Sequence, residues 1–147
     1  MNNEQLNEIF AEAERDGKLV AIVKQPYKNP EAVAIDKGYK EIQKLVGGTF
    51  DVADLPDFDD IHGFCNDEGL LIGLEPNFYR PEWKDAIVGP AVFLGASDDG
   101  ESISLSREQV KKVTEYLETN RVNDFGEFYM NIQTDFAYYK PKKQAAM

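Results

Sequence analysis

Two side chains capable of nucleophilic chemistry, His62 and Cys65, lie three positions apart and are the chain's single histidine and single cysteine. A cysteine thiolate activated by an imidazole is the simplest catalytic pair that these residue types could form. On a strand, residues three apart point to opposite faces, and only a β-bulge would bring them together. One histidine and one cysteine also cannot furnish a closed tetrahedral zinc site without carboxylates. We therefore expect a structural Cys65, a surface or hairpin His62, and no catalytic or metal-binding residues.

A calcium-binding loop is the nearest motif to the acidic triplet Asp57-Phe58-Asp59. The fifth position of such a loop would be Ile61, and its glycine would fall at Gly63 rather than one residue earlier. The pair Gly47-Gly48 lacks the following Lys-Ser/Thr of a phosphate-binding loop. The sequence therefore predicts a turn with solvated acids and no cofactor.

Acidic residues are concentrated between Leu45 and Tyr79, where eight acids and no lysine or arginine occur. They dominate a formal net charge of −11. A surface this negative repels nucleic acid and acidic membranes, and it accelerates encounters with basic partners. We expect no direct contact with nucleic acid or membrane, and a partner-binding acidic face formed by Asp51, Asp54, Asp57, Asp59, Asp60, Asp67 and Glu68.

The composition is that of a folded protein, with 42% hydrophobic and 12% aromatic residues in a chain of 147, which fits a single domain. The single cysteine excludes an internal disulfide and fits a reducing compartment. The start of the chain has neither the basic nor the apolar region of a secretory signal. The longest apolar stretch, Ala86 to Ala96, is far short of the roughly 20 residues that a membrane helix requires. We expect a soluble protein in the cytoplasm of a host cell.

Apolar periodicity predicts three helices, at Glu4 to Asp16, Lys37 to Val46 and Arg107 to Asn120. The first has an apolar stripe on one side and the row Glu4, Glu8 and Glu12 on the other. In the second, Asp36 is the expected N-cap, Gly47 the left-handed C-cap, and the inner face is Tyr39, Ile42, Leu45 and Val46. The third begins with a capping box formed by Ser106 and Gln109.

Strands are predicted at Lys18 to Lys24, Ile61 to Cys65, Leu70 to Leu74 and Ala86 to Ala96. A hairpin connection at Asn66 to Gly69 is expected to join the second of these strands to the third. Gly89-Pro90 would break or bulge the last of them. Because the period-two segments between Thr49 and Ala96 follow one another without a long helix, the expected fold is α+β. We expect an antiparallel or mixed sheet of five to six strands, with about three helices packed on it.

The C-terminal region is rich in aromatic residues between 122 and 139. Phe128, Met130 and Ile132 alternate like a strand that covers the core, and the alternative is an oligomer or partner interface, where tyrosine, phenylalanine and methionine are enriched. Residues 140–147 are typical of a flexible tail.

Four ordered motifs resemble a family of small phage, plasmid and conjugative-element proteins that is catalogued as a domain of unknown function, DUF3846. The motifs are Leu45-Val46-Gly47-Gly48, Cys65-Asn66-Asp67-Glu68-Gly69, Leu74-Glu75-Pro76-Asn77 and Val88-Gly89-Pro90. The resemblance covers about 19–117, which is the family-like core. The helix 4–16 and the segment 122–139 are additions to this core, and the expected single domain is 1–147. It implies an accessory protein of a mobile element, and such elements frequently carry genes that block host defence.

The leading hypothesis is a non-enzymatic protein whose acidic face occupies a basic, nucleic-acid-binding surface of a host defence protein, as a DNA mimic does. The alternative is a protein that binds or sequesters a small ligand, with Asn66, Asn77 and Arg80 lining a pocket. Family members often carry a basic residue directly after the asparagine that matches Asn77, whereas Phe78 stands here and Arg80 is the candidate substitute. An enzyme of the hydrolase or transferase type is the third hypothesis.

Overall fold

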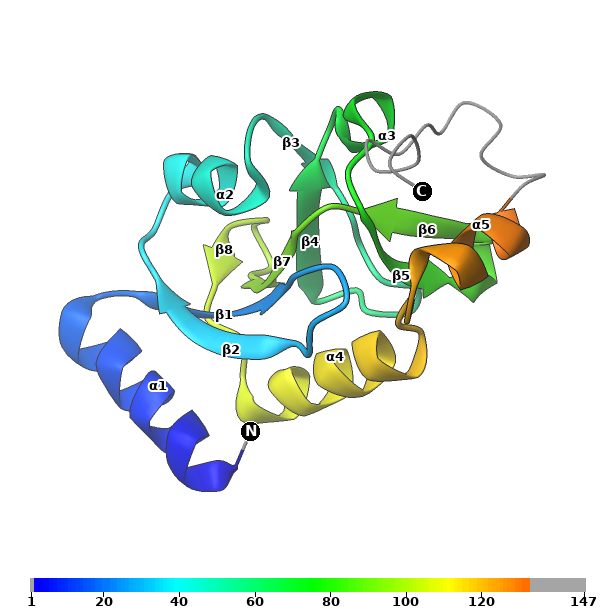
Figure 1. Cartoon of the computed structure of the whole chain (residues 1–147). Helices are drawn as coiled ribbons and strands as arrows, with labels where there is room; N and C mark the ends of the chain where they lie inside the picture. The colour runs from blue at the N-terminus through cyan, green and yellow to red at the C-terminus, as the bar shows by residue number, and fades with distance from the viewer. Residues whose placement is uncertain (1, 133–147) are drawn as a thin grey trace.

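The computed structural model describes residues 2–132 and is built around a six-stranded sheet (Figure 1). The strand order is β2-β1-β7-β4-β3, with β8 paired to β7, and every pairing is antiparallel. The strands are β1 (Leu19–Lys24), β2 (Glu31–Ile35), β3 (Phe50–Val52), β4 (Ile61–Asn66), β7 (Ala91–Ala96) and β8 (Ser102–Ile103). The expected α+β class and an antiparallel sheet are thereby confirmed.

A separate two-stranded hairpin packs on this sheet. It consists of β5 (Pro76–Arg80) and β6 (Asp85–Val88), which a single 3₁₀ turn, η1 (Pro81–Trp83), joins at the tip. Phe78 on β5 is fully buried and packs at 6.0 Å from Phe93 on β7, measured between ring centroids. The hairpin is therefore anchored to the centre of the molecule, and its tip projects to one side.

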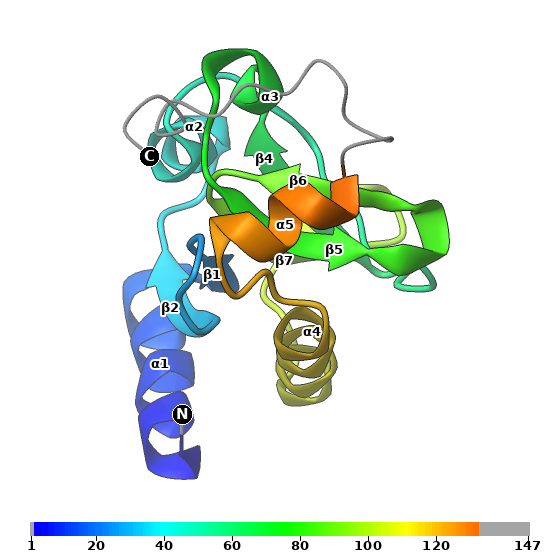
Figure 2. The same cartoon turned by 45° about the vertical axis from the view of Figure 1, so that its right-hand side comes forward.

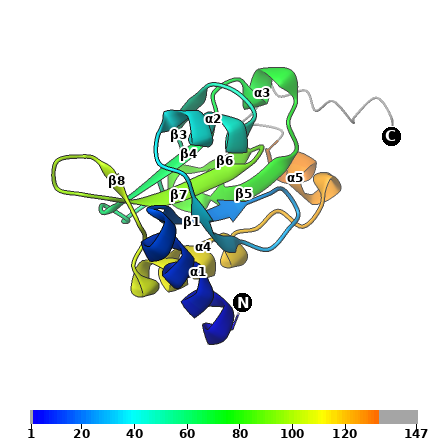
Figure 3. The same ribbon diagram turned by 90° about the vertical axis from the view of Figure 1, so that its left-hand side faces the viewer.

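Three helices of eight or more residues match the predicted ones: α1 (Asn3–Asp16), α2 (Tyr39–Val46) and α4 (Arg107–Thr119). The capping box of Ser106 and Gln109 starts α4, and left-handed glycines end α1 at Gly17 and α2 at Gly47, as expected. Figure 3 shows α2 on one side of the sheet and α1 and α4 on the other.

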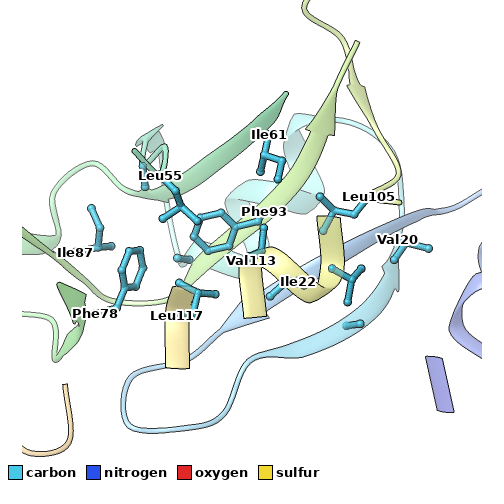
Figure 4. Close-up of a cluster of buried hydrophobic side chains, with 14 of the residues drawn as sticks. Val20, Ile22, Leu55, Ile61, Phe78, Ile87, Phe93, Leu105, Val113 and Leu117 are labelled. Carbon is cyan, nitrogen blue, oxygen red and sulfur yellow. The ribbon is translucent and has the colours of Figure 1, made fainter. Parts of the chain in front are cut away.

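The sheet is buried on both faces. On β1, Val20 and Ile22 join the cluster that contains Phe93 and that α4 covers with Val113 and Leu117 (Figure 4). Ala21 points the other way, into a second cluster with Ile42 and Val46 of α2. This alternation explains why the first strand is apolar throughout, since a strand covered on both sides has no solvent face.

The chain between β4 and β5 was predicted wrongly. The expected hairpin at Asn66 to Gly69 and strand at Leu70 to Leu74 are replaced by a single helical turn, α3 (Gly69–Ile72), which ends at Gly73 with φ of 70°. A Cβ atom on Gly69 would lie 2.9 Å from a methyl carbon of Val88, so this turn approaches β6 closely. A short apolar run fits a helical turn and a strand equally well, and the tertiary contact decides between them.

The predicted break of the strand Ala86 to Ala96 at Gly89-Pro90 is confirmed, and its two parts belong to two different sheets. Gly89, with φ of 78°, and Pro90 turn the chain out of the hairpin and into the central sheet between β6 and β7. Strand β2 was not predicted. In α2, the N-cap is Gly38 rather than Asp36, and Tyr39 is 59% exposed rather than part of the inner face.

The aromatic segment near the C-terminus forms a helix rather than the predicted strand. Phe125–Ile132 is α5, which lies across the β5–β6 hairpin (Figure 2), where Phe128 is buried and stacks on Tyr79 with ring centroids 6.1 Å apart. The rest of the predicted segment 122–139, from residue 133 onward, and the predicted tail 140–147 lie outside the described residues. Within residues 2–132, no helix combines the length and the apolar character needed to cross a bilayer.

Candidate functional site

The seven predicted binding acids lie in β3, which is an edge strand, and in the segments that flank β4. Asp51 is in β3, four more are in the loop from β3 to β4, and Asp67 and Glu68 follow β4. Six of the seven are exposed, and Asp54 is half-buried. None of them forms an ion pair with a lysine or arginine of residues 2–132, although Arg80, Lys18 and Lys112 pair with other acids. The edge therefore carries charge that the described part of the chain does not neutralise.

Short hydrogen bonds hold several of these acids in place. Asp67 accepts from the Thr49 hydroxyl at 2.6 Å, and Asp60 accepts from Nε2 of Gln109 on α4 at 2.9 Å. Asp51 accepts from the backbone N–H of Val52 at 2.8 Å. Since Val52 lies on an edge strand, this bond and the surrounding charge protect the edge from pairing with another strand.

The β3–β4 loop is attached to the molecule by its apolar residues. Leu55 is buried, and Phe58 packs edge-on against Tyr116 of α4, with 5.7 Å between ring centroids. Asp57 adopts a left-handed conformation, with φ of 66°, which aspartate tolerates better than most residues. The loop thus presents Asp57, Asp59 and Asp60 to solvent from a fixed base.

Arg80 joins the hairpin to the same loop. Its Nε and Nη2 atoms donate to the two carboxylate oxygens of Asp85 at 2.8 and 2.6 Å, and its Nη1 donates to the backbone carbonyl of Asp54 at 2.8 Å. The guanidinium carbon also lies 4.7 Å from the centroid of the Trp83 ring. Arg80 is therefore held inside the structure, with its side chain 13% exposed.

His62 and Cys65 are on opposite faces of β4. The His62 ring is tilted relative to the ring of Phe64, with 6.3 Å between ring centroids, on the α2 side of the sheet, whereas Cys65 packs with the cluster on the α4 side. His62 Nδ1 is 3.9 Å from a carboxylate oxygen of Asp54. Burial and the neighbouring Asp51 raise the pKa of the Cys65 thiol to about 11, so it stays protonated at neutral pH and is a poor nucleophile.

The predicted ligand-binding residues Asn66, Asn77 and Arg80 bind separate parts of the backbone. Asn66 is buried beneath the end of α2 and donates to the carbonyl of Val46 at 3.2 Å. Asn77 is fully buried and donates to the carbonyls of Lys24 and Gly89 at 2.7 and 2.8 Å. None of the three lines any of the grooves described below, and no hydrogen-bond partner is common to them among residues 2–132.

Sequence reasoning missed a polar cluster in which Lys24 and Asn77 are fully buried beside the half-buried Arg121. Lys24 is fully buried at the end of β1 and donates from Nζ to the Gln25 carbonyl at 2.7 Å. Burial and the nearby Arg121 lower its pKa to about 8. Asn77 Oδ1 and Arg121 Nε are buried without a hydrogen-bond partner in the described structure. Nothing in the sequence distinguishes Lys24 from an exposed lysine that closes an apolar strand.

Three grooves of about 430 to 500 Å³ are formed by the described residues. Two of them flank Arg107 between α1 and α4, and neither is lined by a residue of β3. The third, of about 470 Å³, lies between α4 and the hairpin tip, and it is lined in part by Phe58, Glu82 and Tyr116. This groove adjoins the acidic loop.

Residues 18–118 match the family model described as domain of unknown function DUF3846, and the chain belongs to this family. The match runs from the start of β1 to the end of α4, so it includes the acidic edge, the hairpin and the loop that Arg80 joins to it. Helices α1 and α5 lie outside it. No curated protein and no solved structure matches the chain.

Proposed function

We propose that the protein is a non-catalytic interaction protein that binds a basic protein partner through the acidic edge, meaning Asp51, Asp54, Asp57, Asp59, Asp60, Asp67 and Glu68. The observation that carries this proposal is that these acids lie in β3 and in the segments that flank β4, without a lysine or arginine partner among residues 2–132. A row of uncompensated charge repels itself, and a partner of opposite charge removes that cost on binding.

The length of the acidic edge supports a nucleic-acid-binding partner. Asp51 pairs across from Cys65, and the Asp60 carbonyl accepts from the N–H of Ala96, opposite the start of β4. The acids therefore follow β4 over its six residues, which span about 20 Å at the rise of an extended strand. In this proposal the partner is a defence protein of a host that carries a phage or mobile element, and the acidic edge occupies the surface that would otherwise hold phosphates.

A charge-reversal experiment tests this function. The variant D57K/D59K/D60K and a control, E4K/E8K/E14K, change the net charge by the same amount, but the control residues lie on α1, which packs against β1 and β2. We expect wild type and the control to retain the same partner from host lysate at low salt and to release it at high salt. The loop variant should lose that partner. Equal retention by both variants would contradict a role for the acidic edge.

A second candidate, binding of a small polar ligand, is supported by the cluster of Lys24, Asn77 and Arg121. A buried acceptor and a buried donor without partners each carry a desolvation cost of about 1–3 kcal/mol, which a bound hydrogen-bonding group would remove. A thermal-shift screen with inorganic phosphate and nucleotides tests it. The candidate requires a stabilisation that N77A abolishes, and an unchanged melting temperature with every compound would exclude those compounds as ligands.

A further inference from the structure

The tip of the β5–β6 hairpin exposes an aromatic ring beside the acidic loop. Trp83, the chain's single tryptophan, is 50% exposed in η1. Tryptophan is the residue most enriched among those that dominate binding energy in protein interfaces. An exposed tryptophan at a fixed turn, next to a charged surface, is therefore a candidate anchor for a partner.

One face of the Trp83 ring is already occupied within the molecule. The Arg80 guanidinium lies 4.7 Å from the ring centroid, and three hydrogen bonds to Asp54 and Asp85 fix that guanidinium. Because Arg80 restricts the ring before any partner arrives, binding loses less side-chain entropy than it would on a freely rotating tryptophan. The solvent-exposed part of the ring is what a partner can reach.

The charges around the ring favour a cation. Exposed Asp57 lies in the loop that Arg80 holds, and Glu82, which precedes Trp83, accepts from the Tyr116 hydroxyl at 2.8 Å. The opposing charges at the tip are Lys84, which follows Trp83, and Arg80, which is paired with Asp85. A guanidinium prefers the electron-rich face of tryptophan and stacks on it better than an ammonium does, because it is planar.

We propose that Trp83 is the anchor of the acidic interaction surface and that its exposed ring binds an arginine side chain of the basic partner. This inference rests on the proposed function and adds to it a chemical preference. Acidic residues attract arginine and lysine alike, whereas stacking on Trp83 selects arginine.

The chain's own fluorescence reports on this site, since Trp83 is its single tryptophan. Titration with hexaarginine and hexalysine peptides at low salt should change the emission of Trp83, and hexaarginine should bind several-fold more tightly. By calorimetry, W83A should weaken hexaarginine binding about tenfold or more and should bring the two peptides to equal affinity. K84E, which replaces the positive charge of Lys84 with a negative one, should tighten binding of both peptides.

L71A is the matched control, because Leu71 is 81% exposed and belongs to α3, which packs near Val88 at the end of the hairpin opposite the tip. It should bind both peptides as wild type does. The binding of a variant is interpreted only after its melting temperature has been shown to equal that of wild type. Equal affinity of wild type for the two peptides, or unchanged binding in W83A, would overturn the inference. If D57K/D59K/D60K weakens binding while W83A does not, the acidic surface stands and the Trp83 anchor falls. If W83A weakens binding and the loop variant does not, the acidic surface falls.

Discussion

Two basic side chains, Arg80 and Lys24, are both largely buried, but of these two only Arg80 is paired with a carboxylate among residues 2–132. Arg80 is paired with Asp85 through two hydrogen bonds and connects the hairpin to the β3–β4 loop. Lys24 is fully buried beside Arg121, and its ammonium group donates a hydrogen bond to a backbone carbonyl. The first stabilises the tip that carries Trp83, and the second destabilises the protonated form of the folded protein.

We expect R80A to lower the free energy of unfolding by about 2–3 kcal/mol, because it leaves Asp85 half-buried without its partner and frees the loop from the hairpin. K84A, four residues along at the same tip, removes an exposed side chain and should change stability by less than about 0.5 kcal/mol. Urea denaturation of both variants measures the difference. Equal stability of the two would show that the Arg80 contacts contribute nothing net.

The lowered pKa of Lys24 predicts how the free energy of unfolding depends on pH. Its pKa is lowered from 10.5 to about 8 in the folded protein, so between these values the unfolded chain binds a proton that the folded chain does not. The free energy of unfolding should therefore rise as the pH increases from about 8 to 10.5. Below about pH 8 the contribution of Lys24 should not change with pH, because Lys24 is protonated in both the folded and the unfolded chain.

K24M removes the buried charge while keeping most of the side chain, and we expect it to be more stable than wild type at pH 7 by about 1 kcal/mol or more. The difference should shrink as the pH approaches 10. Denaturation curves at several pH values measure it, and a constant difference across the range would contradict the assignment to Lys24.

Among the secondary-structure elements, β4 has the tightest constraint. Gly63 faces the backbone of Ala53, and an added Cβ atom would meet the Ala53 carbonyl oxygen and lie 2.7 Å from a ring carbon of Phe93. We expect G63A to lower the free energy of unfolding by about 2–3 kcal/mol. G126A in α5, where the added atom would meet only the Asp124 side chain at 3.3 Å, is the control and should be near neutral. A near-neutral G63A would show that β3 and its loop can move away from β4.

The helices with strong end signals could be predicted from the sequence, and the connections could not. Ser106 with Gln109, and Gly17 and Gly47, are local signals, and they mark α1, α2 and α4 correctly to within two residues. The break at Gly89-Pro90 was predicted from the proline, but the entry of its two sides into different sheets and the turn of α3 depend on how the hairpin packs against the sheet, which local periodicity does not contain.

The candidate site was predictable in the same uneven way. The acids are evident because charge and chain position are properties of the sequence, and their exposure follows from their type. The contact between Arg80, Asp54 and Trp83 joins two segments that are far apart along the chain. The burial of Lys24 and Asn77 likewise depends on the hairpin and on the segment before α5, so no local pattern marks it.

Taken over the whole molecule, the charge is unevenly distributed as well as large. The chain has 27 acidic and 16 basic residues, and the stretch between Leu45 and Tyr79 has no lysine or arginine. Seven of its acids lie in β3 and in the segments that flank β4, and none of the seven lines the two grooves beside α1. An asymmetric field of this kind acts mainly on the rate of association, because it orients a basic partner before contact.

The most direct measurement of this account is the association rate of the captured partner with wild type, D57K/D59K/D60K and E4K/E8K/E14K over a range of salt concentrations. We expect the wild-type rate to fall steeply as salt increases, the α1 variant to retain most of that dependence, and the loop variant to associate at least severalfold more slowly at low salt with a much weaker dependence. Dissociation rates should change less. Identical rates and salt dependences for the two folded variants would contradict the claim that the acidic edge binds the partner.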